Sequence, residues 1–496
     1  FCIVLFSTPF IIDIPTLHLN HSAIFDFFAD QSHNFINFLE ERGNEMEDAF
    51  SSSYARAMKM KNSFDNYVEE QQNKISTEIN SYIENVKDRG LQIANSFSYV
   101  PTQDAASALP VPDAALTVPA RVTRLGYSCE THTVISQGYV LNLHRIPHSK
   151  GGGNISSKTV LLQHGLFASS ADWILNGPDK ALAYVLADGG YDVWMSNVRG
   201  NVYSTEHASL KRNTKSYWNF SWHDIALYDI PAIIDYIMKL KGEDAKITYI
   251  GHSMGTTILF AMLTLRPEYN RLLTAGYALA PVAFMSDLKS PIKALAPLAS
   301  NVARMEMMYG SHEFLPKNSM FGKLVTSCNN EYVDNKLCRN AIFQICGDNE
   351  KQYNETLLPV FLAHFGAGTS WKTIVHYAQE IMAKGRFQFF DLGPWNNKRI
   401  YGTENPPEYD LSKITLPIKL FWAQNDLLST EKDVKNLQER LPATTDIYLV
   451  PDPKFNHLDY LWAIDAPSLL NIVFIFQYSL DVTRDSVHAE LKKRIK

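Results

Sequence analysis

Residues 247–257 read Ile247-Thr248-Tyr249-Ile250-Gly251-His252-Ser253-Met254-Gly255-Thr256-Thr257, and the apolar run 258–265 follows. The first residues favour a short strand and the last ones a helix, with a glycine-flanked serine between them. The pattern G-x-S-x-G is typical of a nucleophile elbow, a sharp strand-to-helix turn that exposes a serine hydroxyl. Side chains in place of Gly251 and Gly255 would collide with the neighbouring backbone. We therefore expect Ser253 to be a nucleophile; the alternative is an ordinary glycine-rich turn.

Composition and charge exclude several classes of protein. Of the 496 residues, 46% are hydrophobic and 12% aromatic, enough for a large core in two or three domains. The formal net charge is -6, and no zinc-finger, P-loop or G-x-G-x-x-G pattern occurs. The sequence predicts no nucleic-acid partner, no cofactor and no metal.

The first residues are apolar. Residues 1–6 and 10–12 are interrupted by Ser7-Thr8-Pro9, and the stretch is shorter than the ~20 apolar residues that span a bilayer. It resembles the apolar region of a signal peptide. We expect a signal-peptide remnant at residues 1–18, with a buried strand as the alternative, and no stable transmembrane span.

A helical extension is expected at residues 19–100. Phe64, Ile75, Val86 and Phe97 mark an 11-residue repeat that places one apolar stripe along a nearly straight helix. We expect one long amphipathic helix or a helical hairpin. That amphipathic stripe needs a partner, either the catalytic domain, another helix or a lipid surface. A linker rich in Pro and Ala is expected at residues 101–120.

Beyond the linker, strands alternate with helices, which predicts a mostly parallel α/β sheet with an antiparallel first hairpin around Gln137-Gly138. The expected strands are 133–136, 139–146, 159–163, 192–195, 246–250, 277–280, 417–423 and 446–450, and the expected helices are 180–188, 223–240 and 256–265. The gap after Ala280 is far too long for a loop. We therefore expect an α/β core at 121–282 and 411–482, a cap or lid insertion at 283–410 and a charged tail at 483–496.

The remaining parts of an esterase site follow the elbow in the expected order. The strand 159–163 ends in His164-Gly165-Leu166, where a hydrolase supplies one oxyanion donor, so the backbone N–H groups of Leu166 and Met254 are the predicted oxyanion hole. Asp426 follows a strand directly, and His457 comes later, in the chain order Ser, Asp, His. The acids considered and set aside are Asp410, Asp452 and Asp459.

Five cysteines and several N-x-S/T sequons bear on the compartment. Cys328, Cys338 and Cys346 crowd into one segment, which suggests a disulfide and a free thiol without fixing the connectivity. Sequons at Asn20, Asn154 and Asn354 are glycosylation candidates. A further sequon lies at Asn219. We expect a secreted or lysosomal protein.

Taken together, these motifs resemble those of the acid lipase family, which includes gastric lipase, lysosomal acid lipase and insect relatives. The resemblance covers residues 118–481 and rests on residues 138–141, 145–147, 163–166, 192–194, 197, 199–201, 227–232, 251–253, 255–257, 367–370 and 456–459. It implies an α/β-hydrolase fold, catalytic Ser253, Asp426 and His457, no metal, and a disulfide between Cys328 and Cys338. The chain departs from the family at Met254 (usually Gln), Gln137 (usually Asp) and 364–366 (where a Pro is usual).

The resemblance implies a serine ester hydrolase, a lipase that cleaves lipid esters such as triacylglycerols or steryl esters at a lipid–water interface through an acyl-enzyme. One alternative is a carboxylesterase acting on small soluble esters. A second alternative is a non-catalytic lipid-binding protein on a hydrolase scaffold. The oligomeric state is not predicted.

Overall fold

The computed structural model describes residues 116–156, 158–242, 245, 247–296, 312–314, 342–442 and 445–471. The predicted signal-peptide remnant, helical extension and charged tail lie outside these residues, as do most of the predicted linker and Asn20. Cys328 and Cys338 also lie outside them, so the predicted disulfide stays a prediction.

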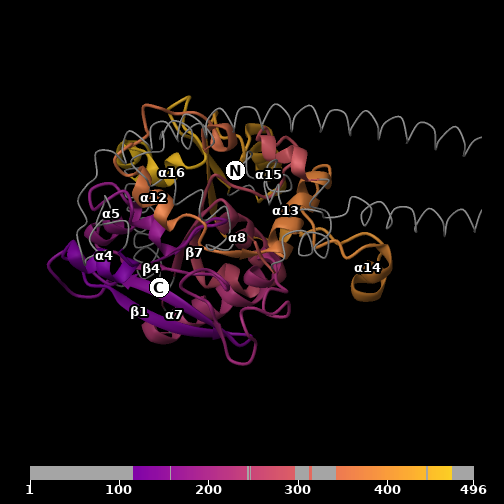
Figure 1. The fold of residues 1–496 in the computed structure, drawn as a ribbon, viewed down its shortest axis with the longest axis horizontal. Helices are drawn as coiled ribbons and strands as arrows, with labels where there is room; N and C mark the ends of the chain where they lie inside the picture. The colour runs from indigo at the N-terminus through magenta and orange to yellow at the C-terminus, as the bar shows by residue number, and fades with distance from the viewer. Residues whose placement is uncertain are drawn as a thin grey trace, which may run out of the picture. The chain divides into compact units, whose positions relative to one another are not determined.

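A nine-stranded, mostly parallel sheet forms the centre of the fold (Figure 1). Its order is β1-β2-β4-β3-β6-β7-β10-β11, with β5 beside β2. Pairing is antiparallel for β1–β2, β2–β4 and β2–β5 and parallel elsewhere. The strands are β1 (Glu130–Ser136), β2 (Tyr139–Ile146), β3 (Thr159–Gln163), β4 (Asp192–Met195), β5 (Glu206–His207), β6 (Ile247–His252), β7 (Leu273–Leu279), β10 (Ile418–Trp422) and β11 (Asp446–Leu449).

The first hairpin forms where the sequence predicted it. Ser136 pairs with Tyr139, and the two residues between them, Gln137 and Gly138, have positive φ values of 48° and 87°. Two successive positive φ values characterise the two-residue turn that matches the twist of a hairpin. The mixed sheet is therefore confirmed together with its antiparallel end.

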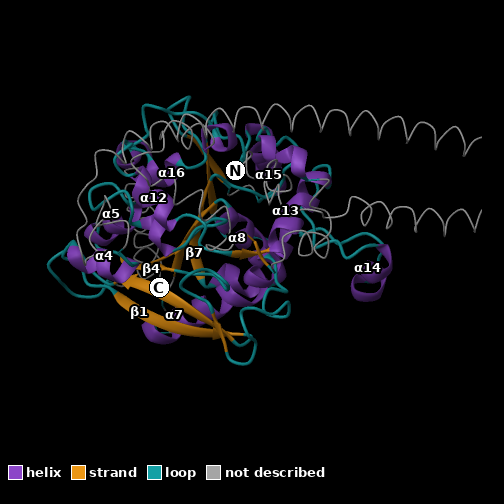
Figure 2. Ribbon diagram, in the orientation of Figure 1, coloured by secondary structure: helices purple, strands orange, loops and turns teal. Residues whose placement is uncertain are grey.

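Helices surround the strands (Figure 2). They are α4 (Val118–Arg124), α5 (Leu182–Asp188), α6 (Trp222–Asp224), α7 (Ile230–Lys241), α8 (Met254–Leu265), α12 (Leu358–His364), α13 (Trp371–Met382), α14 (Pro394–Tyr401), α15 (Glu431–Arg440) and α16 (Asp459–Trp462). The predicted helix 223–240 begins one residue earlier, because the Ser221 side chain accepts from the His223 N–H and Asp224 accepts from the Ser221 N–H. A π-helical turn, Ile225–Asp229, joins α6 to α7.

Two hydrophobic clusters form the core, one on each face of the sheet. Alternate residues of a strand belong to different clusters: Tyr249 packs with α7, α8 and α15, and Ile250 packs with α4, α5 and α16. The side chains of α8 are buried almost all round, from Met254 to Thr264, as expected for a helix that is apolar on every face. This packing fixes the start of α8, where Ser253 lies.

Between β7 and β10 the chain leaves the sheet over residues 280–417. The described part of this insertion holds α12, α13, α14 and a small ribbon of β8 (Glu313–Phe314) and β9 (Thr369–Ser370). α13 packs on the core, since the His376 ring stacks on Trp222 of α6 with centroids 3.8 Å apart. Figure 1 draws α13 and α14 at one end of the described fold, with α14 standing apart from the sheet.

Candidate active site

Ser253 lies between β6 and α8 with φ 52° and ψ -116°, a backbone conformation that non-glycine residues rarely adopt. Its N–H donates to the Leu279 carbonyl at 3.0 Å, which holds the turn against β7. A Cβ on Gly251 would lie 2.7 Å from backbone atoms of Gly255, and one on Gly255 would overlap the Gln163 carbonyl oxygen. The turn thus has the form of a nucleophile elbow, for the steric reason that the sequence suggested.

A row of hydrogen bonds joins Ser253 to the two later residues. The Ser253 hydroxyl lies 2.8 Å from His457 Nε2, and His457 Nδ1 lies 3.0 and 2.9 Å from the two carboxylate oxygens of Asp426. His457 is 3% exposed and Asp426 is 1% exposed. When Nδ1–H donates to the carboxylate, Nε2 is left to accept the serine proton. The structure therefore brings together the three residues that chain order singled out.

Backbone N–H groups hold the Asp426 carboxylate in place. Its Oδ1 accepts from the N–H groups of Leu428 and Ser429 at 2.9 and 2.8 Å. The Ser429 hydroxyl in turn donates to the Pro281 carbonyl at 2.6 Å. Asp426 follows β10 as Ser253 follows β6, and the carboxyl ends of parallel strands share one edge of a sheet.

The two predicted oxyanion donors lie beside the elbow. Met254 is the first residue of α8, where backbone N–H groups have no acceptor within the helix. Leu166 follows Gly165, and a Cβ on Gly165 would lie 3.2 Å from the Ser253 Cβ, so this turn packs directly against the nucleophile. The two residues therefore lie next to the serine, and their role as oxyanion donors stays a prediction.

The peptide groups on both sides of His457 have partners that the sequence did not reveal. The His457 N–H donates to the Cys346 carbonyl at 3.2 Å, and the His457 carbonyl accepts from His252 Nε2 at 2.8 Å. Burial and the nearby His457 lower the pKa of His252 to about 3, so its ring is neutral and carries its proton on Nε2. His252, next to the nucleophile in sequence, thereby connects the elbow to the backbone of His457.

A second buried contact stabilises the turn 456–459 that carries His457. Asp459 Oδ2 accepts from Asn349 Nδ2 at 2.8 Å and from the Asn456 N–H at 2.9 Å, and burial raises the pKa of Asp459 to about 7. Gly347 has a φ of 108°, and a Cβ there would overlap the Asn425 carbonyl oxygen. Residues 346–349, within the insertion, therefore pack against both the loop after β10 that carries Asp426 and the turn 456–459 that carries His457.

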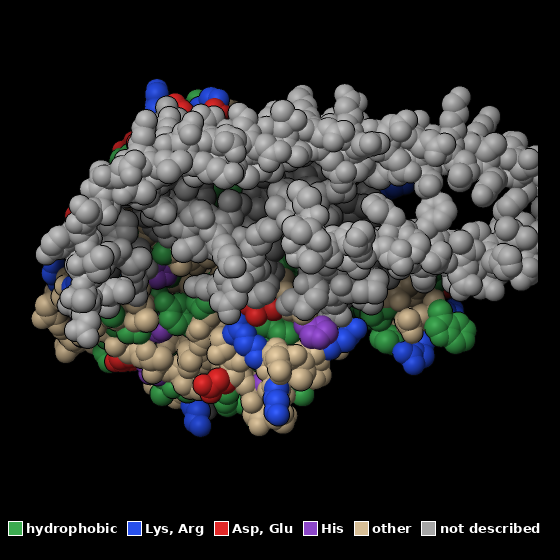
Figure 3. Space-filling model, in the orientation of Figure 1, with side chains coloured by type: hydrophobic (Ala, Val, Ile, Leu, Met, Phe, Trp, Pro, Cys, Tyr) green, Lys and Arg blue, Asp and Glu red, His purple; other side chains and the backbone are tan. Residues whose placement is uncertain are grey.

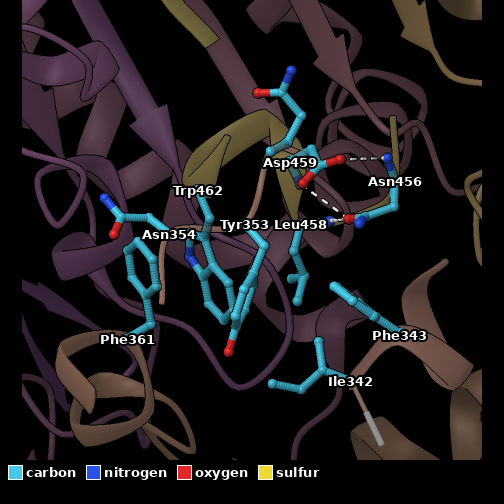
Figure 4. A pocket seen from close by; sticks show the side chains of 10 residues that line it. Ile342, Phe343, Tyr353, Asn354, Phe361, Asn456, Leu458, Asp459 and Trp462 are labelled. Carbon is cyan, nitrogen blue, oxygen red and sulfur yellow. Dashed lines mark hydrogen bonds between the residues drawn. The ribbon is translucent and has the colours of Figure 1, made fainter. Parts of the chain in front are cut away.

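An apolar pocket lies beside this turn, with about 310 Å³ of space free of atoms, part of it open solvent. Figure 4 shows the side chains around it and the hydrogen bonds between Asn456 and Asp459. The lining residues are Ile342, Phe343, Gln352, Tyr353, Asn354, Phe361, Asn456, Leu458, Asp459 and Trp462. Phe361 stacks on Trp462 with centroids 4.4 Å apart. Residues 342–361 of the insertion and residues 456–462 thus line this pocket together.

The three departures from the family pattern are accommodated without new charge. Met254 is buried in the core cluster. The Gln137 side chain accepts from Arg199 Nη1 at 3.2 Å, and Arg199 is ion-paired with Asp229. Gly366 has a φ of 74° and precedes Ala367, whose N–H donates to the carbonyl of Phe167.

Other predicted residues are not part of the hydrogen-bonded row of Ser253, His457 and Asp426. Asn154 is exposed and Asn354 is half-buried, with the Asn354 side chain accepting from the Thr356 N–H and hydroxyl. Cys346 is a buried free thiol, and burial raises its pKa. No helix in the described part of the chain is long and apolar enough to cross a membrane.

A serine at a nucleophile elbow, bonded to a histidine and an aspartate above a mostly parallel sheet, defines an α/β-hydrolase. The chain matches the family described as a partial alpha/beta-hydrolase lipase region over residues 118–177, and the alpha/beta hydrolase fold over residues 158–463.

The similar curated proteins are lipases. Lipase 1 of Drosophila melanogaster is 38% identical over 72% of this chain and 78% of its own length. Gastric triacylglycerol lipase of Rattus norvegicus is 38% identical over 72% of this chain and 90% of its own length. Gastric triacylglycerol lipase of Bos taurus is 39% identical over 72% of this chain and 89% of its own length. The chain belongs to the acid lipase family of α/β-hydrolases and is a carboxylic ester hydrolase.

Proposed function

We propose that this chain hydrolyses carboxylic esters of lipids, such as triacylglycerols or steryl esters, at a lipid–water interface. The observation that carries the proposal is the row Ser253 Oγ, His457 Nε2 and Asp426, with its 2.8 Å bond between nucleophile and base. The substrate class follows from relatives named as triacylglycerol lipases. The half-buried position of Ser253 and an insertion rich in aromatic residues suit an apolar substrate.

In this mechanism His457 takes the Ser253 proton as the hydroxyl oxygen attacks the ester carbonyl carbon. Asp426 keeps the imidazole in the useful tautomer and stabilises its charged form. The tetrahedral oxyanion lies between the N–H groups of Leu166 and Met254, each donor lowering the barrier by about 3 kcal/mol. His457 then protonates the leaving alcohol. Water hydrolyses the acyl-enzyme by the same route, which regenerates Ser253.

The arrangement of the chain is part of the proposal. Residues 121–282 and 411–482 form the hydrolase core, and residues 283–410 act as a cap that opens at a lipid surface. The proposal also includes a secreted or lysosomal location, a disulfide between Cys328 and Cys338, and glycans on Asn20, Asn154 and Asn354. The exposure of Asn154 is compatible with a glycan there.

Replacement of the nucleophile tests the proposal. We expect Ser253→Ala to lower kcat by about 10⁶ on emulsified triacylglycerol and on a short-chain ester, with unchanged thermal unfolding. The control is Ser209→Ala, which removes an exposed hydroxyl. Retained turnover in Ser253→Ala would contradict the assignment.

Two other outcomes would select another function. Turnover of the short-chain ester alone by the unmodified chain would indicate a carboxylesterase. A chain that turns over neither ester and does not react with a serine-directed phosphonate would be a lipid-binding protein.

A further inference from the structure

The helix α14 carries the most exposed large apolar side chain in the described residues. Trp395 is 82% exposed, whereas the other exposed large apolar side chains range from 36% to 59%. Figure 1 draws α14 at the edge of the described fold. Figure 3 shows hydrophobic and basic side chains together at that place. Because the Trp395 indole is so exposed to water, it indicates a binding surface and not a part of the folded core.

The side of α14 that faces away from Trp395 attaches the helix to the rest of the described fold. The Asn397 side chain, 1% exposed, donates to Asp391 Oδ1 at 2.7 Å and to the Glu404 carbonyl at 2.9 Å. The Tyr401 hydroxyl donates to the Phe390 carbonyl at 3.0 Å. Residues four apart share one side of a helix, so Asn397 and Tyr401 fix which side of α14 meets the body.

Two cations accompany the indole on the outer side. Lys398 and Arg399 stand three and four positions after Trp395, so the three side chains are neighbours on the helix surface. Both cations are exposed, and neither forms an ion pair within the described part of the chain. The outer face of α14 therefore combines one large aromatic ring with two exposed positive charges.

This combination fits a lipid surface. Tryptophan is enriched at membrane–water interfaces, where its ring lies at headgroup level, and each Lys or Arg is attracted to anionic headgroups. A two-fold contact with a second copy would bring like charges together, which disfavours self-association through this face. We propose that α14 is a docking element for anionic lipid surfaces, in which Trp395 enters the headgroup region and Lys398 and Arg399 bind its negative charges. The inference rests on the proposed function, because a lipase must reach such a surface.

The test uses the full chain and two variants, Trp395→Ser and the double variant Lys398→Gln with Arg399→Gln. The matched control replaces an exposed apolar residue and an exposed cation on α7, Leu240→Ser with Lys239→Gln. Cosedimentation is measured with phosphatidylcholine vesicles, with and without phosphatidylserine. We expect Trp395→Ser to weaken binding to anionic vesicles roughly tenfold. The double variant should weaken it about fivefold per cation, only when phosphatidylserine is present and less at high salt.

Turnover separates docking from chemistry. Trp395→Ser should raise the apparent KM on emulsified triacylglycerol and leave kcat and KM on a soluble short-chain ester unchanged. Binding of Trp395→Ser to anionic vesicles at the level of the unmodified chain would overturn the docking element, as would a changed oligomeric state with unchanged vesicle binding. Absence of turnover by the unmodified chain on both esters would instead overturn the proposed function. Vesicle binding would still test whether α14 is a docking element.

Discussion

At the scale of single residues, the site depends on a strained serine and on the fixed backbone of its partner. Ser253 has a positive φ, which costs a non-glycine residue about 1–3 kcal/mol. Its hydrogen bond to Leu279 and the close packing of Gly251 and Gly255 hold it there. His457 is held in a different way, because both of its backbone polar groups have partners from other segments.

The contact between His252 and the His457 carbonyl leads to a prediction on rate. His252→Leu removes the donor and leaves a buried carbonyl without a partner, which costs about 1–3 kcal/mol. If the transition state bears that cost, kcat on a soluble ester falls about five- to 150-fold, with little change in KM. His252→Gln, whose side-chain amide can reach the same carbonyl, should recover most of kcat. Equal values of kcat in the Leu and Gln variants would show that this hydrogen bond does not position His457.

At the scale of elements, the insertion is more than a cover over the site. Residues 346–349, within this insertion, supply the Cys346 carbonyl to His457 and the Asn349 amide to Asp459. α13 packs its buried side on α6 through His376 and Trp222. The element that lies between the nucleophile and the acid in sequence therefore also sets the position of the base.

The Asn349–Asp459 contact predicts a pH-dependent loss of stability. Asp459 has a raised pKa, about 7, so it is mostly protonated at pH 5 and mostly ionised at pH 8. Hydrogen bonds to a charged group are worth more than those to a neutral one. Asn349→Leu should therefore lower the free energy of unfolding by about 1 kcal/mol at pH 5 and by about 2–3 kcal/mol at pH 8. Denaturant unfolding at the two pH values measures this, with the exposed Asn405→Leu as control, and an equal loss at both would contradict it.

At the scale of the whole molecule, buried titratable groups make stability depend on pH. His376 and Glu380 lie 3.7 Å apart, yet burial lowers the pKa of His376 and raises that of Glu380. Burial thus favours the neutral form of each group over an ion pair between them. The His376 Nε2–H donates to the Gln388 carbonyl, and Glu380 accepts from the Gln388 N–H.

Glu380 therefore predicts a fall in stability as pH rises. Below the pKa of an unfolded Glu, about 4.3, the carboxyl is protonated in both states and contributes no pH dependence. Above it the unfolded chain ionises while folded Glu380 stays protonated, so stability falls by up to about 1.4 kcal/mol per pH unit. Glu380→Gln should match the unmodified chain at pH 4 and exceed its free energy of unfolding by an amount that grows as the pH rises above about 4.3.

Denaturant unfolding from pH 4 to 7.5 measures the difference. Glu439→Gln, an exposed residue of α15, is the control and should leave the slope unchanged. A Glu380→Gln variant with the same pH slope as the unmodified chain would mean that Glu380 is ionised in the folded protein.

The sequence by itself determined eight of the nine strands of the sheet, the elbow and the order of Ser253, Asp426 and His457. These features depend on short-range sterics, such as the collisions that exclude a Cβ at Gly251 and Gly255, and on hydrophobic periodicity within single elements. The short strands β5, β8 and β9 carried too little of either signal to be predicted, and the helices α4, α12, α13, α14, α15 and α16 were not predicted. Chain order singled out His457 among 15 histidines, and the structure places its Nε2 2.8 Å from the Ser253 hydroxyl because β6, β10 and β11 end at the same edge of the sheet.

Only the tertiary structure decided which distant groups complete the site. Asp459, set aside from the sequence as a wrong acid, proved to hold the histidine turn through Asn349, 110 residues away. The role of His252 as a donor to the His457 carbonyl spans 205 residues. The exposure of Trp395 likewise depends on which side of α14 Asn397 and Tyr401 attach to the body. Such contacts arise from how the sheet and insertion bring separate loops together, and no local pattern of residues encodes that geometry.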